Sequence, residues 1–170
     1  MKKLLALMVG IVFVAGSTYG AMISEGTREL AVQGELQFES EAGTAFDFDI
    51  KLGQFVAHGV QVGVLGGIAD NDFLTAWGAG VFGEYNHDLG TELVPFVGVS
   101  GSYLRVDPDV GSSEDAFVVG AEAGGKYFIA QNIAISLSYL FEWATEDMFF
   151  DNGDVEDTNH SIQLGMRFFF

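Results

Sequence analysis

Large apolar residues occupy every second position near the end of the chain. They are Ile162, Leu164, Met166, Phe168 and Phe170, and smaller or polar residues stand between them. Because successive side chains of a β-strand point to opposite faces, this alternation predicts a strand with one apolar and one polar face. No later segment covers the apolar face, which favours a strand whose outer face meets lipid.

The same alternation recurs in seven earlier segments. With the last one, the expected strands cover residues 29–39, 45–53, 59–68, 74–85, 93–104, 116–128, 133–144 and 159–170. Between them we expect short turns at 54–58, 86–92 and 129–132, and loops at 69–73, 105–115 and 145–158. An even number of strands of about ten residues predicts an all-β fold, an eight-stranded antiparallel transmembrane β-barrel. The barrel has to close, because unpaired backbone groups at a strand edge are costly in lipid.

The first twenty residues differ from the rest. Two lysines precede an apolar run, and Thr18 and Gly20 are small residues at the −3 and −1 positions of a cut before Ala21. This is the pattern of a secretory signal peptide, so we expect residues 1–20 to be removed and residues 21–170 to form the barrel domain. A polar lead at 21–28 would precede the first strand. An N-terminal membrane anchor is the alternative, which the shortness of the run disfavours.

Aromatic residues gather at both ends of the expected strands. With the N- and C-termini in the periplasm, one girdle lies near each membrane interface. The outer girdle comprises Phe38, Phe46, Trp77, Tyr103, Phe141 and Trp143. The inner girdle is less complete and comprises Leu52, Tyr85, Pro95, Tyr127, Phe168 and Phe170. The two longest loops then fall on the outer side, which agrees with this orientation.

Charged residues on the inward faces form the most informative polar set. They are Glu35, Asp47, Asp49, Lys51, Glu84, Glu122, Lys126, Glu142 and Arg167. The interior of an eight-stranded barrel is just wide enough for side chains, so we expect these charges to pair and seal the lumen. Since closure brings the last strand beside the first, Glu35 is the expected partner of Arg167. Acids outnumber bases here, so some carboxylates are expected near the water-filled ends or protonated; a narrow conduit for ions or protons is the alternative.

Charge and composition exclude several classes of protein. The 170-residue chain has 24 Asp and Glu against 7 Lys and Arg, so it offers no basic patch to nucleic acid. It has no Cys and therefore no disulfide or thiolate metal site. The acidic segment 147–157 lacks the glutamate of an EF-hand, so we expect a solvated loop, with weak divalent-ion bridging to lipopolysaccharide phosphates as the alternative. We predict no metal site and no cofactor.

His160 and Ser161 are the nearest approach to a catalytic pair. They adjoin near the outer end of the last expected strand, where a lipid-modifying barrel would need its nucleophile and base. Neighbouring strand residues point to opposite faces, so His160 is expected to face lipid and Ser161 the interior. They cannot form a dyad, and we expect no enzyme. His58 and His87 are expected in solvated turns.

Several stretches resemble the eight-stranded outer-membrane barrel superfamily, which groups the transmembrane domain of OmpA, OmpX and the opacity-type adhesins. They are residues 95–99, 124–128, 131–133 and the terminal Phe170, and the resemblance covers residues 29–170. In that family the terminal aromatic is the signal that the assembly machinery reads, and Met166, Phe168 and Phe170 match its spacing. The resemblance implies a protein of the Gram-negative outer membrane.

The expected function is structural or interactive: the barrel would stabilise the membrane and present its loops. Its expected partners are outer-membrane lipid, lipopolysaccharide and the assembly machinery, and we expect a monomer. A small channel is the alternative and would show measurable conductance. A lipid-modifying enzyme would need a dyad at the rim, which the sequence does not contain.

We predict that the mature protein begins at Ala21, because the small residues at Thr18 and Gly20 form a cleavage site. Mass spectrometry of the protein extracted from membranes should find residues 1–20 missing. Mature protein that still carries Lys2 and Lys3 would rule out this route of secretion.

We also predict that deleting Phe170 lowers the yield of folded barrel, because the resemblance assigns this residue to the assembly signal. The measurement is the intensity of the heat-modifiable folded band on a gel, compared with a Phe170→Tyr variant that keeps an aromatic ring. An unchanged folded yield after the deletion would refute the role.

Overall fold

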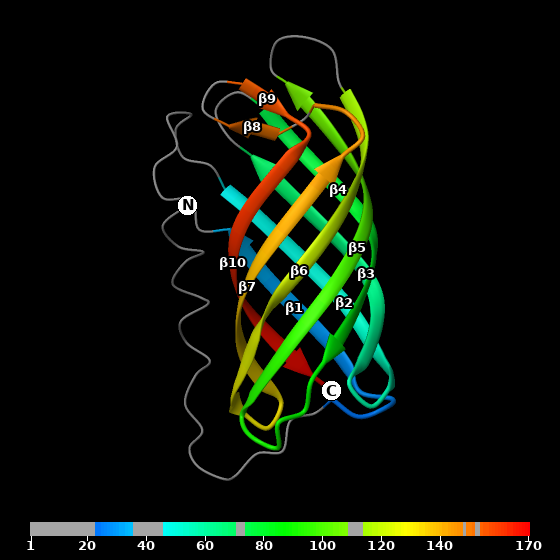
Figure 1. Ribbon diagram of the computed structural model, residues 1–170, viewed down its shortest axis with the longest axis vertical. Coiled ribbons are helices and arrows are strands. Elements are labelled where there is room, and N and C mark those ends of the chain that lie inside the picture. Colours follow the sequence, from blue (N-terminus) through cyan, green and yellow to red (C-terminus); the bar gives the residue numbers. More distant parts are fainter. Residues whose placement is uncertain (1–22, 36–45, 71–73, 109–113, 148, 152–153) are drawn as a thin grey trace.

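Eight strands of this protein close into a single antiparallel barrel (Figure 1). The computed structural model describes residues 23–35, 46–70, 74–108, 114–147, 149–151 and 154–170. The barrel strands are β1 (Arg28–Glu35), β2 (Phe46–Ala57), β3 (Val60–Asp70), β4 (Leu74–Asn86), β5 (Leu93–Pro108), β6 (Glu114–Ala130), β7 (Ile133–Ala144) and β10 (Thr158–Phe169). The predicted all-β barrel of eight antiparallel strands is confirmed. No helix in the described ranges is long and apolar enough to cross a membrane.

The barrel closes where β1 pairs with β10. Leu30 lies opposite Phe168, and Ala31 lies opposite Arg167. At the end of this seam, the backbone N–H of Arg28 donates to the carbonyl of Phe170 at 2.8 Å, and the N–H of Phe170 donates back at 3.0 Å. Every other strand pairs with its sequence neighbour in the barrel, so no strand of the barrel has an unpaired edge.

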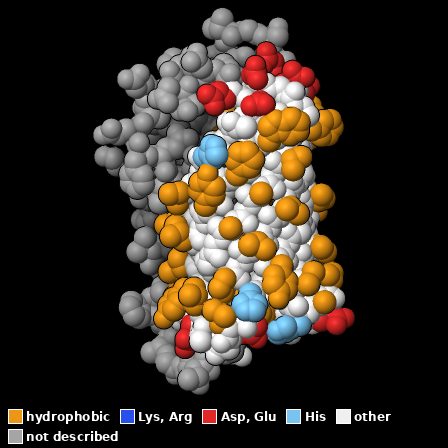
Figure 2. Space-filling view, viewed as in Figure 1, with side chains coloured by type: hydrophobic (Ala, Val, Ile, Leu, Met, Phe, Trp, Pro, Cys, Tyr) orange, Lys and Arg blue, Asp and Glu red, His pale blue; other side chains and the backbone are white. Residues whose placement is uncertain are grey.

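Side chains alternate across the wall as the sequence pattern predicts. Outward apolar residues are widely exposed, up to 66% at Phe117, whereas the inward Lys126 and Arg167 are fully buried. Figure 2 shows apolar side chains spread over the middle of the wall, with acidic residues gathered toward its ends. Burial is thus reversed relative to a soluble domain, because the polar face of each strand forms the core.

The two ends of the barrel differ. One end, here the turn end, carries the tight turn at 58–59, the turns at 87–92 and 131–132, and Phe170 (Figure 1). Gly59 adopts a φ of 72° there, which favours glycine, and its N–H donates to the carbonyl of Ile23 at 2.8 Å. The opposite end, the loop end, carries the hairpin of β8 (Phe149–Asp151) and β9 (Asp154–Glu156).

Several predicted boundaries were wrong. The expected turn at 54–58 is strand as far as Ala57, because Gln54 pairs with both Arg28 and Val62 and a bulge follows at Phe55. The expected loop at 105–115 is largely strand, since β5 runs to Pro108 and β6 begins at Glu114.

Two further segments also differ from the prediction. The expected loop at 145–158 contains the β8–β9 hairpin. The expected polar lead at 21–28 contributes the buried Ile23 and Thr27, and its last residue, Arg28, already belongs to β1. Residues 36–39 of the first predicted strand, with Phe38 of the outer girdle, lie outside the described residues.

Candidate functional site

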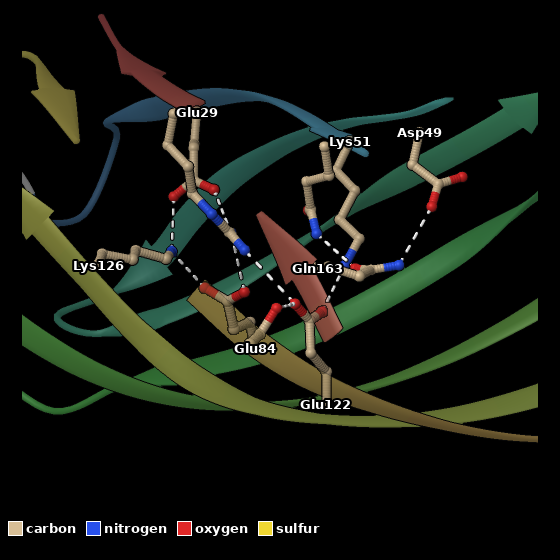
Figure 3. Close-up of polar contacts among 10 residues, drawn as sticks. Glu29, Asp49, Lys51, Glu84, Glu122, Lys126 and Gln163 are labelled. Atoms are coloured by element: carbon tan, nitrogen blue, oxygen red, sulfur yellow. Dashed lines mark hydrogen bonds and ion pairs between the residues drawn. The ribbon is translucent and has the colours of Figure 1, made fainter. Parts of the chain in front are cut away.

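The candidate site lies inside the barrel, where charged residues from five strands meet. We call it the ion-pair cluster, and Figure 3 shows most of its members. It comprises Glu29 of β1, Lys51 of β2, Glu84 of β4, Glu122 and Lys126 of β6, and Arg167 of β10. Each side chain is at least nine-tenths buried, and the strand alternation directs all six inward.

Four members form a closed ring of charge-assisted hydrogen bonds. Lys126 Nζ donates to Glu29 Oε2 at 2.7 Å and also to Glu84 Oε1. Arg167 Nη1 donates to the other oxygen of each carboxylate, at 2.7 Å for Glu29 and 3.1 Å for Glu84. Each carboxylate therefore bridges both cations, which holds β1, β4, β6 and β10 together across the lumen.

The cluster continues from this ring toward the loop end through Glu122. Lys51 Nζ donates to Glu122 Oε2 at 2.5 Å, and the Ser138 hydroxyl donates to Oε1 at 2.6 Å. Arg167 Nη2 lies 3.6 Å from the same Oε1, which links the two parts.

Amide side chains on neighbouring strands extend the polar layer beyond Glu122. Gln33 Nε2 donates to Gln163 Oε1 at 2.6 Å, and Gln163 Nε2 donates to Asp49 Oδ2 at 3.4 Å (Figure 3). These two bonds link β1, β10 and β2 and end at the half-buried carboxylate of Asp49 on the loop-end side.

An apolar layer, here the apolar plug, lies on the turn-end side of the ion-pair cluster. It comprises Ile23, Phe55, Val94, Phe128, Ala134 and Phe169, none of them more than 2% exposed. The rings of Phe128 and Phe169 are 4.9 Å apart between centroids. Lys126 Nζ lies over the rings of Phe55 and Phe169, both at 5.9 Å, so the plug and the cluster are in direct contact.

Charge balance makes this burial tolerable. The cluster contains three carboxylates and three cations, so its formal net charge is zero. In a low-dielectric interior each charge needs a partner, and removing one partner from a buried pair typically costs 3–5 kcal/mol. The arrangement can hold the strands in register and fill the lumen.

Five of the nine inward charges expected from the sequence lie in the cluster: Lys51, Glu84, Glu122, Lys126 and Arg167. Asp49 and Glu142 are half-buried on the loop-end side, where Glu142 Oε2 accepts a bond from Asn159 Nδ2 at 3.1 Å. Of Glu35 and Asp47 the structure describes only the backbone.

The predicted pairing of Arg167 with Glu35 was wrong. Arg167 lies opposite Ala31, and its carboxylate partners among the described side chains are Glu29, Glu84 and Glu122, while the backbone of Glu35 lies four ladder positions away, opposite Gln163. Sequence reasoning missed Glu29 because it stands at the first position of the expected strand. Glu29 lies an even number of positions from the inward Gln33, so alternation places both side chains on the inward face; this was the signal available in the sequence.

The other sequence candidates do not assemble into a site. Ser161 is buried inside the barrel and His160 is exposed on its outer surface, so the two side chains lie on opposite faces. Asp147, Glu156 and Asp157 of the acidic segment are exposed. In the described part of the chain, no three His, Asp or Glu side chains lie close enough together to hold a metal ion.

The end of the chain completes the list of sequence candidates. Phe168 and Met166 face outward and are half-buried, and Phe170 is 60% exposed. Their outward direction agrees with the alternation, and their assignment to an assembly signal stays a prediction.

Comparison with solved structures finds the same fold in bacterial surface proteins. The N-terminal β-barrel domain of Pseudomonas aeruginosa OprF superposes with a TM-score of 0.67 at 17% identity, covering 86% of this chain and 98% of that one. The fold is that of the eight-stranded outer-membrane barrels. Neisserial surface protein A gives 0.63 at 17% identity, over 85% and 97% of the two chains. The Yersinia pestis outer membrane protein Ail gives 0.57 at 12%, over 86% and 100%.

No family model matches the chain, and a search of curated proteins found no match. The likeness to OprF, NspA and Ail therefore establishes a shared fold.

We predict that Glu29→Gln lowers the free energy of unfolding by about 3–5 kcal/mol, because Lys126 and Arg167 lose a shared buried carboxylate. Urea unfolding in lipid vesicles, followed by tryptophan fluorescence, measures this change. The matched control is Glu25→Gln, at an exposed carboxylate nearby, which should change the free energy by less than about 0.5 kcal/mol. Equal effects of the two variants would show that the cluster does not stabilise the barrel.

Proposed function

We propose that this chain is an integral outer-membrane β-barrel protein, a monomer that stabilises the membrane and presents acidic loops, with a lumen sealed to solutes. The observation that carries the proposal is the ion-pair cluster lying directly on the apolar plug. Charged and apolar side chains fill successive layers of the same lumen, so a solute would have to displace both. A protein built this way acts through its outer surface and its loops rather than through its interior.

The apolar outer wall supports the membrane location. The outward side chains are exposed by 42–65% at Ile50, Val81, Val99, Leu137 and Ile162, an arrangement that is costly in water and favourable in lipid. Trp77 and Tyr103 lie 6.1 Å apart toward the loop end, and Trp143 lies there on β7, as expected for an interfacial girdle.

The proposed orientation puts the turn end in the periplasm and the loop end outside the cell. Both Phe170 and the first described residues lie at the turn end, where connections are short, as in barrels whose longer loops face outward. The loop end would then contact lipopolysaccharide, and Phe170 would be available to the assembly machinery. We propose no enzymatic activity, because the residues that could form a rim dyad face opposite sides of the wall.

We predict that purified wild-type protein shows no steady conductance on the porin scale in planar bilayers. Glu84→Gln and Ile23→Ser should each leave the barrel closed, because one layer of side chains remains intact in each case. The double variant should conduct, since water can then enter both layers.

The heat-modifiable band on a gel confirms that each variant is folded, and Glu25→Gln serves as the matched control. Steady wild-type current would refute the sealed lumen and support a small channel. A folded double variant without current would show that these two layers are not what closes the lumen.

A further inference from the structure

His160 is a polar residue on the apolar outer wall. It lies on β10 (Thr158–Phe169), is exposed, and stands opposite Phe141 of β7. Its outward neighbours on the same strand are Ile162 and Leu164, both about half exposed. Apart from the tyrosines, no other described residue between the two girdles places a titratable side chain on this outer surface.

One of the two imidazole nitrogens has a partner in the protein. Nδ1 forms a hydrogen bond with the hydroxyl of Tyr139, and this is the single side-chain hydrogen bond of His160 in the described ranges. We assign the Tyr139 hydroxyl as the donor and Nδ1 as the acceptor, because a phenol O–H donates well and an unprotonated ring nitrogen accepts. Nε2 then carries the ring proton and needs an acceptor.

Neighbouring aromatic rings fix the direction of the imidazole. The His160 ring lies 5.0 Å from the ring of Phe141 and 5.9 Å from that of Tyr139, between centroids. With one nitrogen bonded and one side against Phe141, the ring cannot turn without losing these contacts. Nε2 is therefore presented toward the surroundings of the barrel.

The strand register gives the depth of His160. Thr158 lies opposite Trp143 at the loop end of this wall, and Phe168 lies opposite Ile133 at the turn end. For a strand rising about 3.3 Å per residue and tilted by about 40°, the ten residues between them span about 25 Å, the height of an apolar band. His160, two residues from Thr158, lies about 5 Å inside its edge, just below the level of the indole of Trp143.

At this depth, leaving the N–H of His160 without a hydrogen-bond acceptor costs free energy. Two kinds of lipid oxygen are available near the boundary: phosphate above it and the acyl carbonyls at it. The rim above His160 is acidic, with Glu156 and Asp157 exposed and Asp157 accepting a bond from the Trp143 indole at 3.0 Å. A phosphate would meet these carboxylates, whereas a neutral carbonyl oxygen would not.

We propose that His160, Tyr139 and Phe141 form a lipid-binding site in which Nε2–H of His160 donates to an acyl carbonyl oxygen of an outer-leaflet lipid. This inference rests on the proposed membrane location and adds a specific contact to it. Phe141 supports the ring, Tyr139 fixes its tautomer, and His160 makes the contact.

The test compares two nanodiscs that differ only in the acyl linkage. One contains dimyristoylphosphatidylcholine and the other its ditetradecyl ether analogue, which has no carbonyl oxygen. Nitrogen NMR of histidine-labelled protein reports each imidazole, and His58 and His87 in the turns at the other end are internal controls. The Nε2 signal of His160 should move between the two lipids, while those of His58 and His87 stay unchanged.

A stability measurement gives a second readout. The wild-type unfolding equilibrium should be about fivefold more favourable to the folded state in the ester lipid than in the ether lipid, the size of one net hydrogen bond. His160→Phe keeps the ring contact with Phe141 but lacks the donor, so the difference should vanish. Tyr139→Phe, a positioning variant, should reduce it.

The outcomes separate the site from the membrane location. An unchanged His160 signal between ester and ether lipid would overturn the proposal, as would a signal that responds only when phosphatidylglycerol replaces phosphatidylcholine, which would assign a phosphate instead. Failure of the protein to insert into either nanodisc, seen as a missing heat-modifiable band, would refute the proposed function itself.

Discussion

The pairing of β1 with β10 is the constraint on which the rest of the structure depends. A sheet surrounded by lipid cannot leave backbone N–H and C=O groups unpaired, so its first and last strands have to meet. This seam places Ala31 opposite Arg167 and brings Glu29 into the reach of its guanidinium, although 138 positions separate the two residues in sequence. The ion-pair cluster exists because the barrel closes in this register.

Closure also decides what fills the lumen. Eight strands leave a space for side chains alone, and the inward faces supply charged residues at one level and aromatic residues at the next. Neither layer suffices by itself: an apolar lumen would not fix the register, and the charges need the exclusion of water to interact strongly. The contact of Lys126 with the rings of Phe55 and Phe169 joins the two layers. We interpret the lumen as a support for the wall, with function left to the outer surface.

Alternation along the chain was sufficient to predict the eight strands and the side of the wall that their described side chains face. It could not predict the register across the seam, because a shift by two residues preserves every inward and outward assignment. Glu29 and Glu35 are separated by an even number of positions, so alternation places both on the inward face. The register of β1 against β10 then shows that Glu29 is the one that reaches Arg167. The burial of Ile23 was equally hidden, since an isolated apolar residue has no period and its partners, such as Phe55 and Phe169, are distant in sequence.

The predicted ends of the strands were also wrong, and the reason is physical. At the loop end the apolar face of β5 changes side: Leu104 and Val106 pack inward against Ala116 and Val118 of β6, while Arg105 and Asp107 stand on the outward face. Ion pairs support this outward face: Arg105 Nε lies 3.3 Å from Asp107 Oδ1 on the same strand, and Arg105 Nη1 lies 3.5 Å from Asp115 Oδ1 across the ladder on β6. The lipid contact proposed for His160 depended on the same kind of non-local information. The alternation along β10 predicted that the side chain of His160 faces lipid. Its hydrogen bond to Tyr139 could be identified only from the register between β7 and β10.

The central claim is that the lumen is closed to water at the level of the ion-pair cluster. Its most direct test is the rate at which the guanidinium protons of Arg167 exchange with solvent, measured by NMR in nanodiscs and compared with those of the exposed Arg28. The account predicts that Arg167 protons persist under conditions in which Arg28 protons exchange fully. Exchange at equal rates would show that water reaches the cluster and would contradict the account.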